Sequence, residues 1–490
     1  MSQAPLIEVL DADGAEARQR RAAGALAAAG LGPGDRVAFC LPSSAGLLCA
    51  VLGALRTGVV PVLLNATLVP TERELLLADA RPSLTIIDAA ALAALDRGTP
   101  MDLSPYPLAR PMHYTSGTTG RAKGVWTGIW DQPTAAAAFR DEADLWNFGP
   151  SDVHLVCSPM YHSVSIRFAA GTLLSGGTCV ILSRFDAAAA LAALSGEAEV
   201  VPTTTFMAPA ALHRLLSLGS ALPARFDSLR LLIHAGSPCP PVVKRAAMER
   251  VGPDVLWEFY GSTEGQFTVC SSAEWSERPG TVGRARVGRH LTVDDDGTVW
   301  CRPPSFARFV YWNDEAKTAG AWRDGSFTVG DIGRLDGDGY LFLDGRRDDL
   351  IISGGVNVYP AEVEAALADV PGVSEVAVFG VPDETWGERV CAAVIPDADV
   401  RDPVGHDGSF DVSLLRAQAE ARLAPYKRPK EYIVARSLPR TATGKLQRRL
   451  IPEVLGLGGG ERTRERTGER TGERTRERSG GRSRERRGEQ

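Results

Sequence analysis

The sequence predicts an α/β protein in which a large N-terminal domain precedes a smaller α+β domain. Strand and helix patterns alternate along residues 16–235, short strands with Gly and Asp turns follow from about residue 281, and the pattern changes again after residue 348. Strand–helix alternation is typical of parallel sheets joined by right-handed crossovers. A chain of 490 residues is long enough for more than one domain.

The alternation begins with an alanine-rich helix, which we expect over residues 16–29 and which Gly30 would close. Ser43 or Ser44 can cap the next helix, expected to reach about residue 57, because a serine hydroxyl accepts a hydrogen bond from the first turn. Further helices are expected over 71–80 and 168–175 and near residue 187. The predicted strands are residues 36–41, 59–64, 84–87, 153–157, 178–182, 199–201 and 231–234.

We expect residues 1–347 to form the large domain, with a β-rich subdomain at about 281–345, and residues 348–455 to form a small mobile domain. The tail from 456 to 490 is of low complexity. Residues 461–490 hold 11 Arg, 7 Glu and no apolar side chain. Such a segment cannot bury a core, so it is predicted to be disordered and without a role in chemistry.

Bulk composition excludes several function classes. The formal net charge of −6 gives no indication of nucleic-acid binding. The eight cysteines include no C-x-x-C pair, so neither a zinc site nor a disulfide framework is indicated, and free cysteines fit a cytoplasmic protein. No signal peptide is apparent. The most apolar stretch, residues 47–64, is interrupted by Arg56 and Pro61, so no membrane span is expected.

The most distinctive stretch is residues 114–125, which read Tyr-Thr-Ser-Gly-Thr-Thr-Gly-Arg-Ala-Lys-Gly-Val. Glycines let backbone N–H groups converge on an anion, the hydroxyls add donors, and Lys123 adds a positive charge. This pattern predicts phosphate binding. It is not a P-loop, because Lys123 lies three residues after Gly120 and no Ser or Thr follows it. Taken alone, a flexible loop rich in turn residues has the same composition.

Further polar clusters lie at the ends of predicted strands or near the C-terminus of the small domain. Each alone has an ordinary interpretation as a capped helix, a turn or a solvated ion pair. They are Pro-Met-Tyr-His at 159–162, Tyr-Gly-Ser-Thr-Glu at 260–264, Gly-Asp-Ile-Gly at 330–333, Gly-Arg-Arg-Asp-Asp at 345–349 and Arg-Thr-Ala-Thr-Gly-Lys at 440–445.

In this order, the clusters resemble those of the acyl-activating, adenylate-forming superfamily over about residues 16–452. Residues 348–360 and 426–430 are most similar to those of bacterial aryl- and fatty-acid–CoA ligases such as 4-chlorobenzoate–CoA ligase. The resemblance implies two half-reactions with ATP, Mg²⁺ and coenzyme A. A carboxylate attacks the α-phosphorus of ATP to give acyl-AMP, and the thiol of coenzyme A then displaces AMP.

The resemblance also implies the nucleotide contacts. Glu264 would bind Mg²⁺, which favours carboxylate and phosphate oxygens. Asp331 would accept hydrogen bonds from the ribose hydroxyls with help from Arg346, and Tyr260 would lie against the adenine. The other positions expected around the phosphates and the adenine are Thr115, Ser116, Gly117, Thr118, Thr119, Gly120, Lys123, Ala235, Gly236, Gly261, Ser262 and Thr263.

Three further residues are expected to act in catalysis. Lys445 would bridge the substrate carboxylate and the ribose or α-phosphate oxygens during adenylation. His162 would lie between the carboxylate pocket and the thiol route. Asp348 matches the hinge at which the small domain rotates between the two half-reactions. The positions expected to contact coenzyme A are Gly354, Gly355, Trp386, Arg428 and Lys430.

The acid pocket is expected to contain mostly small or apolar residues, which favours an apolar aryl or a medium- to long-chain acid. Ser163 stands where amino-acid-activating relatives carry an Asp. Arg167 could recognise a second anionic group, but we expect it to be structural and to point elsewhere. The other positions expected in this pocket are His162, Val164, Ile166, residues 234–237 and Gly261.

Departures from the family pattern are modest. Ala122 replaces a common Pro, Val329 replaces a Thr, and the short N-terminus leaves open whether the chain forms a homodimer.

The preferred hypothesis is an ATP-dependent carboxylic acid–CoA ligase. A second hypothesis passes the acyl group to a carrier-protein thiol acting in trans, an amine or another nucleophile. A third is a non-catalytic nucleotide-binding or scaffold protein, which the presence of Glu264, Asp331 and Lys445 argues against.

Overall fold

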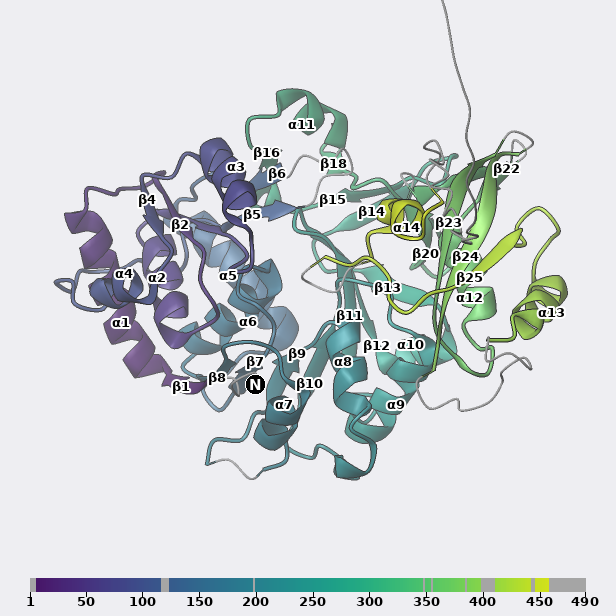
Figure 1. Ribbon diagram of the computed structural model, residues 1–490. Helices are drawn as coiled ribbons and strands as arrows, with labels where there is room; N and C mark the ends of the chain where they lie inside the picture. The colour runs from purple at the N-terminus through teal and green to yellow at the C-terminus, as the bar shows by residue number, and fades with distance from the viewer. Residues whose placement is uncertain are drawn as a thin grey trace, which may run out of the picture.

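The computed structural model describes residues 6–115, 123–196, 199–346, 349–353, 356–383, 386–397, 410–441 and 446–457. The strands in this part of the chain form four sheets. Figure 1 shows the N-terminal helices, in purple, at one side of the molecule and the small C-terminal domain, in green to yellow, at the other. The α/β class with a large N-terminal and a smaller C-terminal domain is confirmed.

One sheet of six strands lies toward the N-terminal side and is parallel at its core. Its strands, in spatial order, are β16 (Val310–Tyr311), β6 (Lys123–Trp126), β5 (Met112–Thr115), β3 (Val60–Leu63), β2 (Arg36–Phe39) and β4 (Leu84–Ile86). The strands β2–β5 pair in parallel, whereas β6 and β16 run antiparallel. The residues between β5 and β6 are the expected phosphate loop, so the sheet brings both ends of that loop together.

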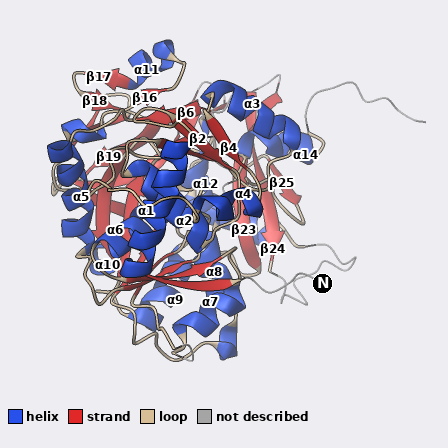
Figure 2. Cartoon of the chain, turned by 90° about the vertical axis from the view of Figure 1, so that its left-hand side faces the viewer, coloured by secondary structure: helices blue, strands red, loops and turns tan. Residues whose placement is uncertain are grey.

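Four N-terminal helices lie on this side of the molecule, and the first two of them pack closely on each other. They are α1 (Ala12–Ala28), α2 (Ala45–Leu55), α3 (Pro70–Ala80) and α4 (Ala89–Leu95). Nearly every residue of α2 is buried, as expected of a helix that is apolar on all sides. Figure 2 shows α1 and α2 side by side. A Cβ atom on Gly53 would lie 2.5 Å from the Gln19 carbonyl oxygen, so glycine is required for this approach.

The largest sheet has ten strands and crosses the middle of the large domain. Its order is β1 (Ile7–Asp11), β8 (Thr178–Leu182), β7 (Val153–Val156), β9 (Thr204–Phe206), β10 (Leu231–His234), β11 (Leu256–Gly261), β12 (Gln266–Ser271), β13 (Thr281–Ala285), β20 (Tyr340–Arg346) and β19 (Asp331–Leu335). The strands β8 to β11 are parallel, and the rest pair antiparallel. Its helices are α5 (Gln132–Trp146), α6 (Ser163–Leu174), α7 (Ala187–Leu194), α8 (Pro209–Leu216), α9 (Pro241–Val251) and α10 (Ser272–Glu277).

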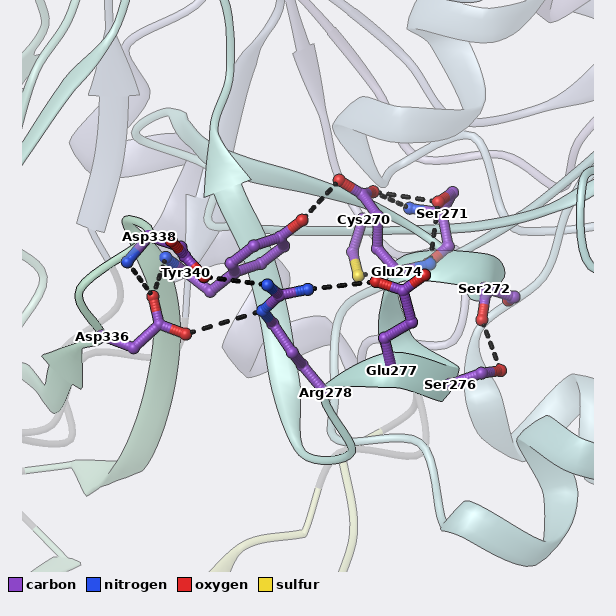
Figure 3. A network of polar contacts seen from close by, with 10 residues as sticks. All are labelled: Cys270, Ser271, Ser272, Glu274, Ser276, Glu277, Arg278, Asp336, Asp338 and Tyr340. Carbon is purple, nitrogen blue, oxygen red and sulfur yellow. Dashed lines mark hydrogen bonds and ion pairs between the residues drawn. The ribbon is translucent and has the colours of Figure 1, made fainter.

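The turn of the β19–β20 hairpin is anchored to α10 by a polar network (Figure 3). Arg278 donates to Asp338 at 2.9 Å, and its guanidinium lies 4.3 Å from the centre of the Tyr340 ring. The Tyr340 hydroxyl donates to Glu274 at 3.1 Å. Glu274 also closes the capping box of α10 with Ser271. The network holds the hairpin at its turn, opposite the end that carries Asp331.

The two remaining sheets lie in the second half of the chain. One has four strands, β14 (His290–Val293), β15 (Val299–Arg302), β18 (Ser326–Phe327) and β17 (Trp322–Arg323), with α11 (Glu315–Ala321) beside it. The small domain has five strands, β22 (Val356–Val358), β21 (Ile351–Ser353), β24 (Gly387–Pro396), β23 (Val373–Asp383) and β25 (Glu431–Val434). It also contains α12 (Pro360–Leu367), α13 (Ser413–Arg422) and α14 (Ile451–Val454).

The structure differs from the sequence-based expectations at several elements. Residues 199–201 are not a strand, and the strand instead begins at Thr204, after Pro202, which has no N–H group to donate. Threonine is β-branched and suits a strand, and the buried Thr205 hydroxyl donates to the Leu155 carbonyl at 3.1 Å. Helix α6 begins at Ser163, earlier than expected.

The expected β-rich subdomain at about 281–345 is spread over three sheets. Strands β13, β19 and β20 join the ten-stranded sheet, and β16 joins the six-stranded sheet. The N-terminal strand β1, which the sequence did not suggest, adds an antiparallel edge. Local patterns predict strands but not their pairing partners, which depend on packing of distant segments. All eight cysteines are free thiols, as expected. No helix in the described ranges combines the length and apolarity needed to cross a bilayer.

Candidate active site

Three side chains expected to contact the nucleotide meet where the open end of the β19–β20 hairpin approaches β11. Asp331 begins β19, Arg346 ends β20, and the register pairs them. Arg346 Nε donates to Asp331 Oδ1 at 2.9 Å, and the Tyr260 hydroxyl donates to Asp331 Oδ2. Burial raises the pKa of Tyr260 well above its ordinary value, and Asp331 raises it further, so the phenol stays protonated. Asp331 is thus a buried carboxylate fixed by two donors, with acceptor capacity left for hydroxyl groups.

Glu264 and Lys123 both lie against Tyr311, although Glu264 is in the turn between β11 and β12 and Lys123 begins β6 in another sheet. The Tyr311 hydroxyl donates to Glu264 Oε1 at 2.9 Å. Lys123 Nζ lies 5.7 Å from the centre of the same ring, because β16 pairs with β6. The structure therefore places the expected metal-binding carboxylate beside the end of the expected phosphate loop. Tyr311 was missed by the sequence reasoning, since only the pairing of β16 with β6 reveals its position.

The fit of a magnesium ion depends on Glu264. Among the described residues, no group of three or more His, Cys, Asp or Glu could hold a metal. Mg²⁺ usually binds one or two carboxylates and completes its shell with water and substrate phosphates. Glu264 is 8% exposed and its carboxylate is oriented by Tyr311. A single oriented carboxylate near Lys123, which ends the expected phosphate loop, fits a Mg²⁺ ion that is bound together with ATP.

The turn between β11 and β12 positions Tyr260 and Glu264. The Ser262 N–H donates to the Gly265 carbonyl oxygen at 2.8 Å. A Cβ atom on Gly261 would lie 2.7 Å from that oxygen, so any side chain there would displace the turn. The register of the two strands also shifts between Tyr260 and Gly261, as at a β-bulge. Thr263 and Ser262 line a cavity described below.

His162 lies directly before α6, at its N-cap position. Its ring packs against Tyr161 with centroids 4.4 Å apart. Burial lowers the pKa of His162 to about 4, so the imidazole is neutral at neutral pH. At the end of β10, Ala235 is buried, whereas Gly236 is exposed and has a φ of +95° that glycine adopts without strain. These positions follow the ends of parallel strands, where α/β sheets bind ligands.

Histidine burial makes the stability of the fold depend on pH. Burial lowers the pKa of His113, His162 and His234 to about 4 and that of His154 to about 3. In the unfolded chain each titrates near 6.5. The unfolded state therefore binds more protons below pH 6.5, and each histidine costs up to about 1.4 kcal/mol per pH unit there. We expect the thermal midpoint to be constant between pH 7 and 8 and to fall steeply from pH 6.5 toward 4.

A matched variant tests this origin of the acid sensitivity. His154 Nδ1 lies 2.9 Å from the Thr204 hydroxyl, and the ring is buried between strands. In His154→Gln the amide can keep that hydrogen bond but cannot titrate. We expect a shallower fall in the thermal midpoint between pH 6.5 and 5 than in the parent protein. An unchanged midpoint from pH 7 to 5 in the parent protein would contradict the assignment.

The residues expected at coenzyme A are only partly brought together. Lys430 Nζ lies 4.9 Å from the centre of the Trp386 ring, and Trp386 is exposed. Arg428 instead donates to the carbonyl oxygens of Leu423 and Glu420, at 2.9 and 3.1 Å. Those carbonyls end α13, so the guanidinium caps a helix C-terminus. Trp386 and Lys430 form an exposed pair that could meet a ligand, whereas Arg428 has a structural partner.

Several expected site residues lie outside the described residues. For Thr115 only the backbone, in β5, is described. The others outside the described ranges are Ser116, Gly117, Thr118, Thr119, Gly120, Asp348, Gly354, Gly355 and Lys445.

Comparison with known proteins defines the class of this chain. The model of the AMP-binding enzyme family matches residues 13–105 and 111–305, and that of the AMP-binding enzyme C-terminal domain matches residues 362–445. The chain belongs to this family of adenylate-forming enzymes.

Individual relatives are similar over most of their length. The long-chain-fatty-acid–CoA ligase FadD13 of Mycobacterium tuberculosis is 31% identical over 88% of this chain and 90% of its own. A feruloyl-CoA synthase of an Amycolatopsis species is 33% identical over 88% of this chain and 90% of its own. The solved structure of o-succinylbenzoate coenzyme A synthetase from Bacillus subtilis, in complex with ATP and a magnesium ion, has a TM-score of 0.74 and 27% identity, covering 90% of this chain and 93% of that one.

Proposed function

We propose that the chain is an ATP-dependent carboxylic acid–CoA ligase that acts on a small-molecule aryl or medium- to long-chain acid. The observation that carries this proposal is the convergence of Glu264 and Tyr311 with Lys123, which ends the hydroxyl- and glycine-rich segment, together with Asp331 held by Tyr260 and Arg346. The named relatives are CoA ligases of both acid types. Free cysteines throughout the chain support a cytoplasmic location.

Adenylation needs positioned cations and donors more than covalent catalysis. The carboxylate oxygen attacks the α-phosphorus of ATP, and pyrophosphate leaves with its negative charge spread over phosphate oxygens. Lys123 and the loop residues would hold the β- and γ-phosphates, and Glu264 would hold the Mg²⁺ that neutralises them. Asp331 would fix the ribose through its free acceptor capacity. Lys445 would stabilise the charge that develops at the reacting oxygens.

For thioester formation, a different face of the small domain would have to lie against the site that holds the acyl-AMP. The thiol attacks the acyl carbon, the C–O bond to AMP breaks, and AMP leaves with that oxygen. We propose that the small domain rotates about Asp348 between the half-reactions, so that Lys445 leaves and Trp386 and Lys430 approach coenzyme A. The neutral imidazole of His162 could then accept a hydrogen bond from the incoming thiol.

Hydroxylamine trapping tests the proposed function. Purified protein, ATP and Mg²⁺ are incubated with aryl, cinnamyl and medium- to long-chain acids, and hydroxamates report adenylates. Coenzyme A is then added in place of hydroxylamine, and acyl-CoA is measured. We expect adenylate formation with part of the panel and conversion to acyl-CoA. Adenylate without acyl-CoA would favour a carrier-protein thiol or an amine as acceptor. Failure to form any adenylate would favour a non-catalytic nucleotide-binding protein.

A further inference from the structure

A cluster of charged side chains lies beside the proposed acid pocket, and positive charge is in excess. The members come from α5, α6, the segment before β5 and the segment after β13. They are Arg110, Arg167, Arg286 and Arg289, together with Asp141 and Glu142. Four guanidinium groups thus share two carboxylates. Arg110 is half-buried, and charge that is partly removed from water without a counter-charge is costly, so such an excess indicates an additional anion.

The ion pairs in this cluster are unevenly distributed. Arg286, 1% exposed, bonds both carboxylates, at 2.7 Å to Asp141 and 2.9 Å to Glu142. Arg289 donates to Asp141 at 2.8 Å, and Arg167 donates to Glu142 at 3.2 Å. Arg110 has no ion pair with any residue in the described ranges, and its guanidinium lies 6.0 Å from the Trp130 ring. The carboxylates are therefore already used by the other three arginines.

The pKa values agree with this distribution. Burial raises the pKa of Glu142, but Arg167 and Arg286 outweigh it and bring the pKa down to about 2, so this carboxylate is charged. Burial is the largest cause of a lowered pKa at Arg110; Arg167 and Arg289 also lower it, Glu142 opposes them, and together they bring the pKa to about 10. A bound anion next to Arg110 would remove this penalty on its cation.

A cavity of about 40 Å³ opens among these groups, and it is lined by polar atoms without partners. Arg110, Arg167, Arg289 and Glu142 all line this cavity. The side chain of Arg289 is 2% exposed. Within the part of the chain that the structure describes, no hydrogen-bond partner reaches any of several buried atoms on this lining. They are Arg167 Nε, Arg289 Nε, Gln266 Nε2, Ser262 Oγ, Thr127 Oγ1 and His113 Nε2. Five of these six can donate a hydrogen bond, as a carboxylate ligand requires.

The cavity is close to the reacting end of the acid pocket. Ser163, which directly follows His162, lines it, as do Ser262 and Thr263, which directly precede Glu264. Arg167 lies one helical turn after Ser163 on α6, a rise of about 6 Å. Arg167 lines this cavity together with Ser163, and its ion pair with Glu142 agrees with the structural role expected of it. The cavity is too small for a long alkyl chain.

We propose that the acid substrate carries a second carboxylate, a few bonds from the reacting one, which binds between Arg110, Arg167 and Arg289. This inference rests on the proposed ligase function and changes its acid from a medium- to long-chain or simple aryl acid to a compact dicarboxylic acid, aliphatic or aromatic. Gln266 and Ser262 complete the donors. The alternative occupants are the phosphates of ATP. They are less well placed, because Tyr260, Arg346 and Lys123 do not line the cavity, although Ser262 and Thr263, which are expected near the nucleotide, do.

Matched pairs of acids test the proposal on the purified full chain. Each pair differs by one distal carboxylate: butanoate and butanedioate, hexanoate and hexanedioate, benzoate and each of the three benzenedicarboxylates. Acid-dependent ATP–pyrophosphate exchange gives kcat/KM for each acid. A site built to bond a polar group rejects the analogue that lacks it. We expect the diacid to exceed its partner by at least about 10-fold in one or more pairs.

Arg110→Met tests the site directly, because it removes a cation without leaving a carboxylate unpaired. The ratio of kcat/KM for the diacid to that for the monoacid should fall by about 10- to 100-fold, mainly through the KM of the diacid. Arg110→Lys should retain part of the ratio. Arg140→Met, an exposed neighbour of Asp141, is the control and should leave the ratio unchanged. Thermal midpoints confirm that each variant is folded.

The outcomes separate this inference from the proposed function. Exchange with monoacids that equals or exceeds exchange with diacids, or an unchanged ratio in Arg110→Met, would overturn the second-carboxylate site and leave the ligase intact. An equal rise in the KM of ATP with both acids in Arg110→Met would assign the cluster to phosphates instead. Absence of exchange with every acid would contradict the ligase, and the inference with it.

Discussion

Replacing Lys445 with alanine should abolish acid-dependent ATP–pyrophosphate exchange, with a loss on the order of 10³-fold. The reason is that a single positioned cation at the reacting oxygens is expected to supply much of the stabilisation of developing charge, and loss of one such donor typically costs 10²- to 10³-fold. Thioester formation from supplied acyl-AMP should be largely retained, because that half-reaction starts after the phosphorus has been attacked. Radiolabelled pyrophosphate exchange and acyl-CoA release measure the two halves separately.

Lys427→Ala is the matched control in the same domain. Lys427 is paired with Glu362 at the surface, and such pairs contribute little to stability. We expect this variant to exchange pyrophosphate at close to the parental rate. Equal losses of both half-reactions in Lys445→Ala would refute the proposal that Lys445 acts in adenylation but not in thioester formation. Full retention of pyrophosphate exchange would also refute it.

Lys244→Met should destabilise the large domain by about 3–5 kcal/mol. Lys244 on α9 is 1% exposed, and its Nζ lies 2.7 Å from Glu258 Oε2 on β11. The ammonium group also lies 4.7 Å from the centre of the Trp275 ring. Removal of the lysine leaves Glu258 buried without a counter-charge, which costs much more than loss of an exposed ion pair. The thermal midpoint and denaturant unfolding measure the loss.

The double variant Lys244→Met, Glu258→Met separates loss of attraction from the cost of an unpaired charge. Replacement of a whole buried pair by apolar side chains is often close to neutral. We therefore expect most of the lost stability to return. Glu258 lies two residues before Tyr260, so activity of the single variant should fall together with the folded fraction. A loss below about 1 kcal/mol in Lys244→Met, or no recovery in the double variant, would contradict this assignment.

Much of the fold could be predicted because it follows from local chemistry. Ser44 caps α2 through a hydrogen bond to the Leu47 N–H at 3.1 Å, as its position before an apolar run indicated. The strands at 178–182 and 231–234 are continuous apolar runs and were placed correctly. Pairing between distant segments could not be predicted in this way. The antiparallel edge strand β1 and the distribution of residues 281–345 over three sheets depend on tertiary packing.

In the candidate site, too, residues within sequence motifs could be predicted, whereas residues brought in by tertiary packing could not. The family motifs indicated Glu264, Asp331 and Tyr260 from sequence order alone, and the structure brings Asp331 and Tyr260 into contact. Tyr311, which joins Glu264 to Lys123, carried no local signal because its strand has only two residues. The arginine cluster was also missed, apart from Arg167. Its members are separated by up to 179 positions, from Arg110 to Arg289, so only the folded chain places them around one cavity.

The transfer of oxygen from acid to nucleotide is the most direct test of acid activation through an adenylate. An accepted acid is labelled with ¹⁸O in both carboxylate positions and incubated with the protein, ATP, Mg²⁺ and coenzyme A. Attack of the carboxylate on the α-phosphorus, followed by cleavage of the acyl C–O bond, predicts AMP that carries one ¹⁸O atom. Unlabelled AMP, or label recovered in a phosphate product, would contradict the account.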